Sequence, residues 1–350
     1  MAILVGLGSP LLDITANVGA EFLEKYGLEE NGAVLIDEEN KGTFMQTFNE
    51  VLALDSVTLL PGGSALNTIR VFQWVLNGIN GANKNERATF FGSVGSDREA
   101  EMLIEKTSET GVDVKFQQIQ GVRTGTCLSL IRGPNRSLCA CLAAADKFTL
   151  DFLQLPENAK LIESSKCFYS AAFFLTVCPE AVLHLATTAA KLEKPFLFNL
   201  SAEYIATKYK RELNEILPFV DVLFANDGEA IAYAHTNGFK STSDLHEIAL
   251  DLTRIEKARE GLGRIVLITR GDQPLIMAQN GRIKEFPVIL VEKMVDTNGA
   301  GDAFCGGFVA AFACGFPMEK CIKYALSSAA TIVQQKGCTF PEEWKCPDFD

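Results

Sequence analysis

Histidine is scarce in this sequence, and its cysteines follow no ligand spacing. Only three histidines occur among 350 residues, and the ten cysteines include no Cys-x-x-Cys motif. A zinc site built from these residue types is therefore not expected. Most of the cysteines lie in apolar segments, where reduced thiols pack as small hydrophobic groups. We therefore expect an intracellular protein, cytoplasmic or nuclear, that is not secreted.

An excess of basic residues and long apolar runs are also missing. The 32 lysines and arginines are outnumbered by 44 acidic residues, which gives a net charge of −12. An acidic surface repels nucleic acid and anionic membranes, so neither is expected as a partner. The N-terminal stretch MAILVGLGSPLLD lacks the basic start and long apolar core of a signal peptide. No apolar run reaches the length of a membrane span.

Short apolar runs alternate with helical patterns along most of the chain. Continuous apolar strands that alternate with helices predict a parallel sheet covered on both faces. The expected fold is thus a Rossmann-like three-layer αβα sandwich with a mostly parallel sheet, whose active site lies at the carboxyl ends of the strands. The expected strands are 2–7, 88–94, 166–171, 195–200, 221–225 and 264–269, and the expected helices are 66–76, 98–110, 179–192, 203–217, 301–314 and 317–335, with one more from Asp227.

Two parts of the chain break this alternation. Residues 33–36, 124–131 and 137–142 predict isolated strands separated by turn residues. We expect them to belong to a small β-rich lid that closes over a substrate. The predicted lid comprises residues 15–60 and 119–142, and the predicted large α/β domain comprises residues 1–14, 61–118 and 143–350.

The stretch from Asp296 to Phe304, DTNGAGDAF, predicts a helix start that binds an anion. Gly299, Ala300 and Gly301 would place three backbone N–H groups side by side, and the helix dipole would point at the same anion. Asp302 would repel a phosphate, but it suits a general base that takes the proton of an attacking hydroxyl. A simple helix cap is the alternative, although one cap does not require three small residues between two acids.

Three further groups of residues suit a polar ligand. Gly62 and Gly63 precede a predicted helix and let the backbone approach a ligand, with Ser64 and Asn67 close by. Asp13 follows the first predicted strand, where a carboxylate can accept two hydrogen bonds from a vicinal diol; a surface turn is the alternative. Asn226 and Glu229 follow the strand 221–225 on one helical turn, and here an ordinary capping box is the alternative.

Taken together, the motifs DTNGAGD, GGSALN and NDGE resemble, in order and spacing, the signatures of the ribokinase-like (PfkB) carbohydrate and nucleoside kinases. The resemblance implies the ribokinase-like fold, ATP as phosphoryl donor and a monomer. It also implies Mg²⁺ held by Asn226 and Glu229 through water, and a monovalent cation such as K⁺ near Asp296.

Residues 10–14, 125–127, 135–138, 172–177 and 337–342 are similar to the members of this family that act on adenosine. The resemblance then implies transfer from ATP to the adenosine 5′-hydroxyl, with Asp302 as base and lid closure that excludes water. It assigns the ribose to Asp13, Gly62, Gly63, Ser64 and Asn67, and the purine to Leu35, Cys127, Leu138 and Phe174. It assigns the phosphates to Arg136 and the ATP site to Asn226, Thr269, Gly271 and Asn298.

Three positions depart from the family pattern around the nucleoside. Ser9, Ala33 and Leu66 replace polar residues that are usual there, whereas the phosphoryl-transfer motifs are intact. A related kinase that acts on inosine, guanosine or a free sugar therefore stays open. A nucleoside-binding protein without turnover is the other alternative, and it conflicts with the intact Asp302 and glycine-rich motif.

Overall fold

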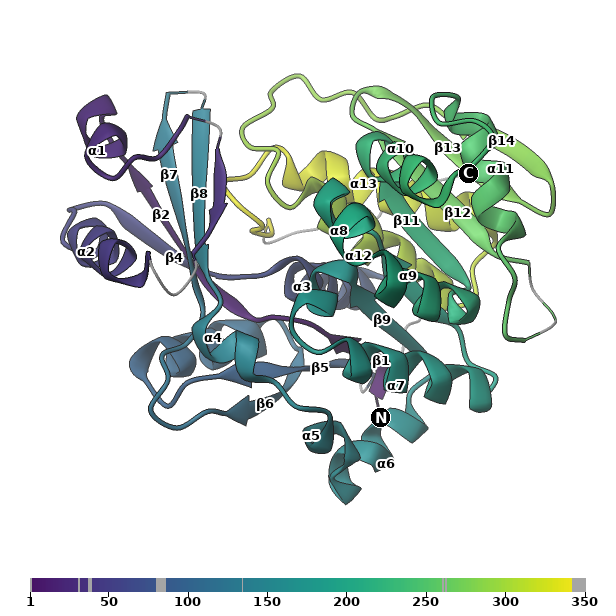
Figure 1. Ribbon diagram of the computed structural model, residues 1–350, viewed down its shortest axis with the longest axis horizontal. Helices are drawn as coiled ribbons and strands as arrows, with labels where there is room; N and C mark the ends of the chain where they lie inside the picture. Colours follow the sequence, from purple (N-terminus) through teal and green to yellow (C-terminus); the bar gives the residue numbers. More distant parts are fainter. Residues whose placement is uncertain are drawn as a thin grey trace.

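The computed structural model describes residues 2–30, 32–36, 40–79, 86–133, 135–259, 261 and 263–341. Within these residues the chain builds a large sheet of nine strands and, beside it, a smaller sheet of five strands (Figure 1). Helices cover both faces of the large sheet, so the predicted three-layer architecture with a second, β-rich part is confirmed.

The large sheet has the strand order β14-β13-β12-β11-β10-β9-β1-β5-β6. Neighbours from β12 to β6 pair in parallel, and the β12-β13-β14 end is antiparallel. The central strands are buried along almost their whole length, because both faces carry apolar residues that helices cover. The strands are β1 (Ala2–Leu7), β5 (Arg87–Val94), β6 (Asp113–Gln118), β9 (Cys167–Ala171), β10 (Phe196–Asn199), β11 (Val222–Asn226), β12 (Ile265–Arg270), β13 (Gln273–Gln279) and β14 (Arg282–Phe286).

The helices divide between two apolar cores, one on each face of this sheet. One core contains α3 (Ser64–Gly78), α4 (Arg98–Glu109), α12 (Ala300–Ala313) and α13 (Met318–Ile332). The other contains α5 (Leu150–Gln154), α6 (Pro156–Ser164), α7 (Pro179–Lys191), α8 (Glu203–Lys208), α9 (Lys210–Ile216), α10 (Asp227–Asn237) and α11 (Leu245–Arg254), with the 3₁₀ turns η2 (Ala172–Thr176) and η3 (Leu217–Phe219). No helix in the described ranges is long and apolar enough to cross a bilayer.

Two glycines let α12 lie very close to its neighbours. A Cβ atom on Gly306 would lie 2.6 Å from the Thr68 carbonyl oxygen of α3, and one on Gly307 would lie 2.4 Å from the Ser328 hydroxyl of α13. The small-residue composition of this helix is therefore a packing requirement. It brings the first turns of α3 and α12 together.

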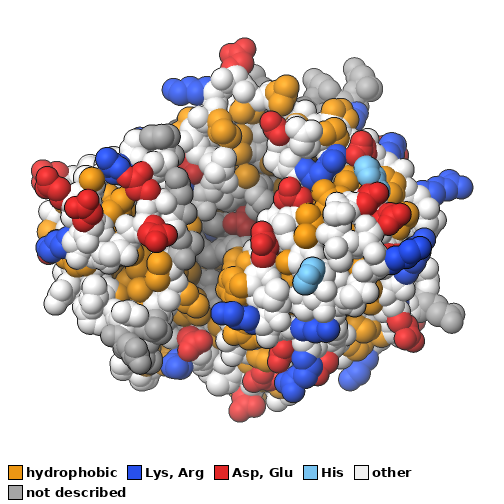
Figure 2. Space-filling model, turned by 45° about the horizontal axis from the view of Figure 1, so that its top comes forward, with side chains coloured by type: hydrophobic (Ala, Val, Ile, Leu, Met, Phe, Trp, Pro, Cys, Tyr) orange, Lys and Arg blue, Asp and Glu red, His pale blue; other side chains and the backbone are white. Residues whose placement is uncertain are grey.

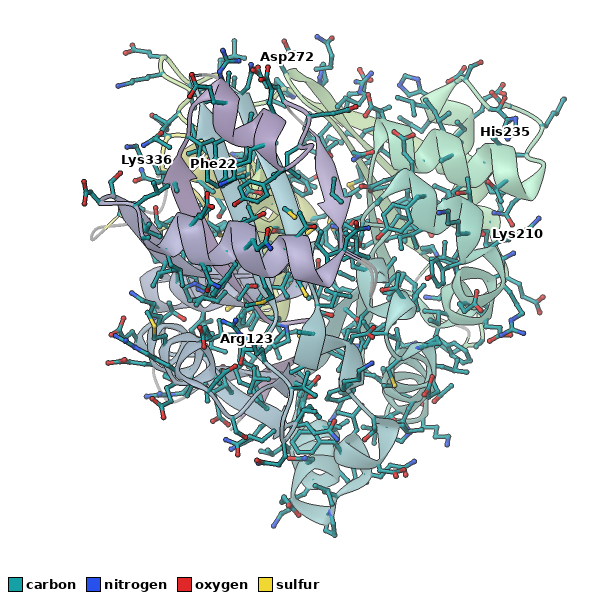
Figure 3. All side chains as sticks on the ribbon, turned by 60° about the vertical axis from the view of Figure 1, so that its left-hand side comes forward. Phe22, Arg123, Lys210, His235, Asp272 and Lys336 are labelled. Atoms are coloured by element: carbon teal, nitrogen blue, oxygen red, sulfur yellow. The ribbon has the colours of Figure 1, made fainter. Side chains whose placement is uncertain are left out.

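The second sheet has the order β3-β8-β7-β2-β4. One of its faces packs on α1 (Ala20–Lys25) and α2 (Lys41–Leu52) around its own apolar core, and Figure 3 shows these two helices in front of the sheet, with Phe22 on α1. The strands are β2 (Leu11–Asn17), β3 (Ala33–Leu35), β4 (Val57–Gly62), β7 (Thr126–Arg132) and β8 (Asn135–Cys141), and η1 (Ala143–Lys147) follows β8.

The chain passes directly between the two sheets near its N-terminus. β1 of the large sheet ends at Leu7, and β2 of the second sheet begins at Leu11. The predicted domain limits at 14/15 and 60/61 therefore fall inside β2 and β4. Division of the molecule into a large domain and a closing lid stays a prediction.

Candidate active site

A cleft of about 350 Å³ lies where the carboxyl ends of the central strands face the second sheet. Figure 2 shows the surface hollowed between the two parts of the molecule, with acidic side chains inside the hollow. Three carboxylates line the cleft, and its described lining contains no lysine or arginine. The lining residues are Leu11, Asp13, Gly63, Ser64, Asn67, Cys127, Leu138, Phe173, Asn199, Ser201, Phe224, Ala225, Asn226, Glu229, Thr269, Asn298, Gly299, Gly301, Asp302, Phe304 and Cys305.

Asp302 lies in the first turn of α12 and is held by the first turn of α3. The Ser64 hydroxyl donates to its Oδ1 at 2.6 Å, and the Asn67 amide Nδ2 donates to its Oδ2 at 3.2 Å. Burial raises the pKa of Asp302 from 3.8 to about 6, and the two hydrogen bonds act in the opposite direction. The carboxylate is thus oriented and has more affinity for a proton than an exposed aspartate, which suits a general base.

The glycine-rich segment before α12 supplies fewer available amides than predicted. Gly299 has a left-handed conformation with φ of 79°, and Gly299 and Gly301 both line the cleft. The Ala300 N–H, however, donates to the Thr297 carbonyl at 3.2 Å in the turn that precedes the helix, and Ala300 is not part of the lining. The prediction of three unpaired amides is therefore wrong for Ala300 in this conformation.

Asp13 follows β1, as predicted, but it lies inside a second strand. It is the third residue of β2 and pairs with Leu60 of β4 and Cys127 of β7. This strand was not predicted; the chain resumes an extended conformation directly after Pro10. Burial raises the pKa of Asp13 from 3.8 to about 7, the positive charge of Arg70 opposes this rise, and the negative charge of Asp302 adds to it.

The two glycines before α3 are required by close backbone approaches. A Cβ on Gly62 would lie 2.1 Å from the carboxylate of Asp13, and one on Gly63 would lie 2.2 Å from the Ser9 carbonyl oxygen. Gly63 also has a φ of 91°, which favours glycine. Gly62 does not line the cleft; it makes room for Asp13, and Gly63 forms part of the wall.

Asn67 is buried between two charged groups, with its oxygen toward one and its nitrogen toward the other. The Arg70 Nη1 donates to Asn67 Oδ1 at 3.3 Å, and Asn67 Nδ2 donates to Asp302. Sequence reasoning missed Arg70. Its spacing of three residues from Asn67 on a helix was an available signal, because such residues share a face.

Asn226 and Glu229 form a capping box, which is the alternative that their spacing predicts. The Asn226 backbone N–H and its Nδ2 donate to the two Glu229 oxygens, each at 2.9 Å, and the Glu229 N–H donates back to Asn226 Oδ1 at 2.8 Å. Burial raises the pKa of Glu229 from 4.5 to about 7. Both residues also line the cleft, so capping does not remove them from the site.

Arg136 of the second sheet contacts Asp296, which lies in the segment between β14 and α12. Arg136 of β8 donates from Nη2 to Asp296 Oδ2 at 2.5 Å, and the Gly337 N–H donates to the same oxygen at 2.7 Å. The Asn298 N–H donates to Asp296 Oδ1 at 2.9 Å. Neither residue lines the cleft in this conformation.

Comparisons with known proteins identify the family of the chain. A model described as pfkB family carbohydrate kinase matches residues 21–345. The chain belongs to this kinase family. Adenosine kinase 2 of Arabidopsis thaliana is 37% identical over 350 residues, which covers 99% of this chain and 97% of that relative.

Crystal structures of pfkB-like nucleoside kinases have the same fold. Anopheles gambiae adenosine kinase in complex with P1,P4-di(adenosine-5) tetraphosphate matches with a TM-score of 0.86 and 39% identity over 96% of both chains. Adenosine kinase from Schistosoma mansoni in complex with 2-fluoroadenosine matches with a TM-score of 0.87 and 29% identity over 97% of both chains. The predicted ribokinase-like fold is confirmed.

Three residues that the pfkB resemblance assigned to the purine or to the ATP site do not line the cleft. Phe174 is 1% exposed and packs edge-on against Phe148 in the core, whereas Phe173 is 37% exposed and lines the cleft. Gly271 lies in the exposed turn between β12 and β13 and does not contribute to the lining. Thr269, Asn298, Cys127 and Leu138 do line the cleft, as predicted.

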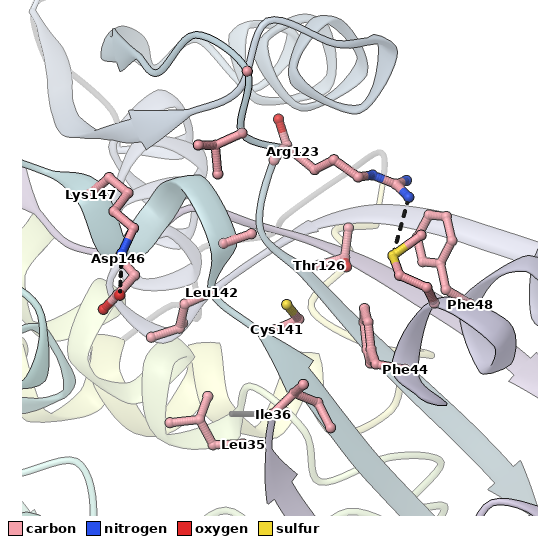
Figure 4. Close-up of a pocket in the computed structure, with 15 residues that line it drawn as sticks. Leu35, Ile36, Phe44, Phe48, Arg123, Thr126, Cys141, Leu142, Asp146 and Lys147 are labelled. Atoms are coloured by element: carbon pink, nitrogen blue, oxygen red, sulfur yellow. Dashed lines mark hydrogen bonds and ion pairs between the residues drawn. The ribbon is translucent and has the colours of Figure 1, made fainter. Parts of the chain in front are cut away.

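Leu35, the third of these residues, lines a different cavity of about 610 Å³ behind the second sheet (Figure 4). Thr126 and Cys141 line this second cavity, while Cys127 and Leu138 line the first. Because side chains alternate along a strand, the two cavities lie on opposite faces of the sheet. Leu35 itself pairs in register with Ala140, which pairs with Cys127 on the cleft-facing side of the sheet, so its assignment to the purine site stays a prediction.

The departures from the pfkB pattern have unequal consequences. Leu66 is fully buried in the core and does not line the cleft, so it acts on a ligand only through packing. The Ser9 carbonyl faces Gly63 at the edge of the site. Ala33 pairs through its backbone with Leu138. Sequence reasoning also missed Asn199 and Ser201, although the end of a predicted strand was a signal for Asn199.

Proposed function

We propose that this chain is an adenosine kinase that transfers the γ-phosphoryl group of ATP to the 5′-hydroxyl of adenosine, giving AMP and ADP. The observation that carries the proposal is the partly buried Asp302 carboxylate, which Ser64 and Asn67 orient at the start of α12 in the shared cleft. The full-length similarity to adenosine kinases supports the choice of nucleoside.

The proposed reaction uses the two opposite walls of the cleft. Asp13 of the second sheet accepts hydrogen bonds from the ribose diol, and Phe173, Cys127 and Leu138 contact the purine. Asp302 takes the 5′-hydroxyl proton as the oxygen attacks the γ-phosphorus. The Gly299 and Gly301 amides face the transferred group and stabilise its charge.

The residues of the cleft fit a magnesium ion bound with the donor nucleotide. A cleft lined by three carboxylates and no cation repels a polyphosphate, so a bound cation is needed to offset the charge. Mg²⁺ keeps several waters and takes few protein carboxylates, which agrees with Asn226 and Glu229 on one wall. When bound, it would offset the negative charge of the donor phosphates.

Asp296 does not fit a monovalent cation in this conformation. Both of its oxygens accept hydrogen bonds, and Arg136 places a positive charge on one of them. We therefore derive no step through K⁺. Arg136 reaches the phosphates in the proposed closed state only after it leaves Asp296.

Monomeric state, lid closure and a cytoplasmic location are further parts of the proposal. The second sheet supplies Asp13, Cys127 and Leu138 to the cleft, which supports closure of this sheet over the nucleoside. The nine described cysteines carry free thiols, which supports a reducing compartment.

An ADP-release assay with MgATP tests the proposal directly. We expect turnover with adenosine and formation of AMP, and no turnover above the background without acceptor for inosine, guanosine or ribose. Turnover with only one of these other acceptors would mean that the protein is a related kinase that acts on that acceptor. Tight adenosine binding without product would favour the binding protein over the enzyme.

A further inference from the structure

A buried arginine lies directly behind the cleft. Arg70 is 4% exposed on α3, one turn after Asn67, and burial lowers its pKa. Its Nη1 donates to three oxygens: the Pro61 carbonyl at 3.0 Å, Asn67 Oδ1 at 3.3 Å and the Cys338 carbonyl at 3.2 Å. Burying a guanidinium costs free energy, so packing alone does not explain why an arginine occupies this position.

The chemistry of its neighbours fixes the orientation of the Asn67 amide. Arginine only donates hydrogen bonds, and an ionised aspartate only accepts them. With Arg70 on one side and Asp302 on the other, the oxygen of Asn67 must face Arg70 and its nitrogen must face Asp302. A flipped amide would place two oxygens against each other and two donors against each other. Arg70 thus selects the orientation that donates to Asp302.

The same guanidinium also anchors the segment that packs against the glycine-rich turn. It holds the Cys338 carbonyl, and it lies 4.9 Å from the centre of the Phe340 ring. The Cys338 side chain lies 3.1 Å from the position of a Cβ on Gly299, so this segment contacts the turn that begins α12. One charged group therefore joins the end of β4, the first turns of α3 and the Cys338 segment.

We propose that Arg70 is a positioning residue for phosphoryl transfer: it orients Asn67, which holds Asp302, and it anchors the segment that packs on Gly299. This inference rests on the proposed kinase function. Arg70 is not part of the cleft lining, so it acts through Asn67 and the Cys338 segment.

The pKa of Asp302 is the quantity that should change when Arg70 is replaced. Five titratable groups interact with Asp302, one from its own helix and four from other parts of the chain: Cys305, Asp13, Tyr169, Glu229 and Cys338. The hydrogen bond from Asn67 lowers the pKa of Asp302. Loss of this bond therefore raises that pKa and moves the acidic limb of the kcat profile to higher pH.

The test compares Arg70→Met, Arg70→Lys and Asn67→Ala, singly and with Arg70→Met combined with Asn67→Ala. Arg264→Met is the matched control, because Arg264 is 1% exposed and also donates to several backbone carbonyls, away from the cleft. The measurements are kcat and the KM of adenosine from pH 5 to 8 with saturating MgATP, and urea unfolding of each variant.

We expect Arg70→Met to lower kcat by roughly 10- to 100-fold and to raise the acidic limb by about half a pH unit or more. The shift should be absent when Asn67 is already alanine. Arg70→Lys keeps the charge but not the planar geometry and should fall between wild type and Arg70→Met. Arg264→Met should lose stability and leave the acidic limb in place.

The proposal would be overturned if folded Arg70→Met kept the wild-type kcat and the wild-type acidic limb of the kcat profile. It would also be overturned if Arg70→Met shifted this limb equally in the presence of Asn67 and of Asn67→Ala. If Arg70→Met does not fold, wild-type kcat and limb in Arg70→Lys would overturn it. A wild-type protein that phosphorylates no acceptor would contradict the proposed function instead. The ¹³C NMR titration of the Asp302 carboxyl then decides on Arg70 without substrate: a raised pKa in Arg70→Met supports the proposal, and an unchanged one rejects it.

Discussion

At the scale of single residues, two of the three carboxylates in the cleft, Asp13 and Asp302, differ in their surroundings. Asp302 receives hydrogen bonds from Ser64 and Asn67, whereas none to the Asp13 side chain is formed within the described residues. Burial raises the pKa of both groups, and only in Asp302 do hydrogen bonds from side chains act against this rise. Asp13 is thus left with acceptor capacity for a ligand, and Asp302 is prepared as an oriented base.

Asp302→Asn is expected to lower kcat by roughly 10²- to 10⁴-fold and to change the KM of adenosine little. Asparagine keeps the size of the side chain and can still accept from Ser64, but it takes no proton at neutral pH. Steady-state kinetics with adenosine and MgATP measure both constants. Turnover equal to that of the wild type would contradict the role of general base.

Asp13→Asn is expected to stabilise the unliganded protein at pH 8 and to weaken nucleoside binding. The raised pKa means that the folded state binds this proton more tightly than the unfolded state. The corresponding stability is complete below pH 4 and is lost as pH rises through about 7. From pH 5 to pH 8, the free energy of unfolding of the wild type should fall by on the order of 1–3 kcal/mol more than that of Asp13→Asn. Urea unfolding at the two pH values measures this difference.

The control for this comparison is Asp55→Asn, which removes a carboxylate that is exposed. It should change the stability difference between pH 5 and 8 very little. Equal pH dependence in the wild type and Asp13→Asn would contradict the cost of burying Asp13.

At the scale of elements, the parallel strands could be predicted because both faces of the large sheet are buried. β9 and β11 are continuous apolar runs, and this pattern is visible in the sequence. β4 and β6 are only partly buried, and β14 is largely exposed, so their sequences lack that pattern and were missed. β2 was missed because it follows β1 after only three residues.

The same limit applies to the residues of the site. The glycine-rich motifs locate Asp302 and Asn67, since they depend on local backbone geometry. The choice between Phe173 and Phe174 depends on a 3₁₀ turn, η2, in which neither strand nor helix periodicity applies. The spacing of Arg70 from Asn67 shows only that they share a helix face; its contact with the Cys338 carbonyl could not be predicted, because that residue lies 268 positions away along the chain.

Gly306→Ala should show how the contact between α3 and α12 determines activity. A Cβ at this position would lie 2.6 Å from the Thr68 carbonyl and force the helices apart, which moves Asp302 away from Ser64 and Asn67. We expect a loss of about 1–3 kcal/mol in the free energy of unfolding and a fall in kcat that exceeds any rise in KM. Denaturant unfolding and steady-state kinetics measure these effects.

Gly42→Ala in α2 is the matched control, because a Cβ there has no atom within 4 Å. Replacement of an exposed helical glycine should stabilise the protein slightly and leave kcat unchanged. Equal behaviour of the two variants would mean that the helix contact does not control the position of Asp302.

At the scale of the whole molecule, one wall of the site comes from the second sheet and the other from the large sheet with its helices. Asp13 on β2 and Asp302 on α12 belong to different walls, and the Arg136–Asp296 ion pair joins the same two parts in this conformation. A nucleoside that contacts both walls must therefore stabilise the molecule as a unit. By mass action this stabilisation depends only on ligand concentration and affinity.

Adenosine is expected to raise the thermal midpoint more than 2′-deoxyadenosine at equal concentration. At 100 times its dissociation constant, adenosine adds about 2.7 kcal/mol to the free energy of unfolding. The deoxynucleoside should add less, because it lacks one hydroxyl of the diol that Asp13 binds. In Asp13→Ala the two nucleosides should give the same small shift, because the group that distinguishes them is gone. Thermal scans of both proteins with both ligands measure this. A difference between the ligands that persists in Asp13→Ala would place the ribose diol on another residue of the cleft.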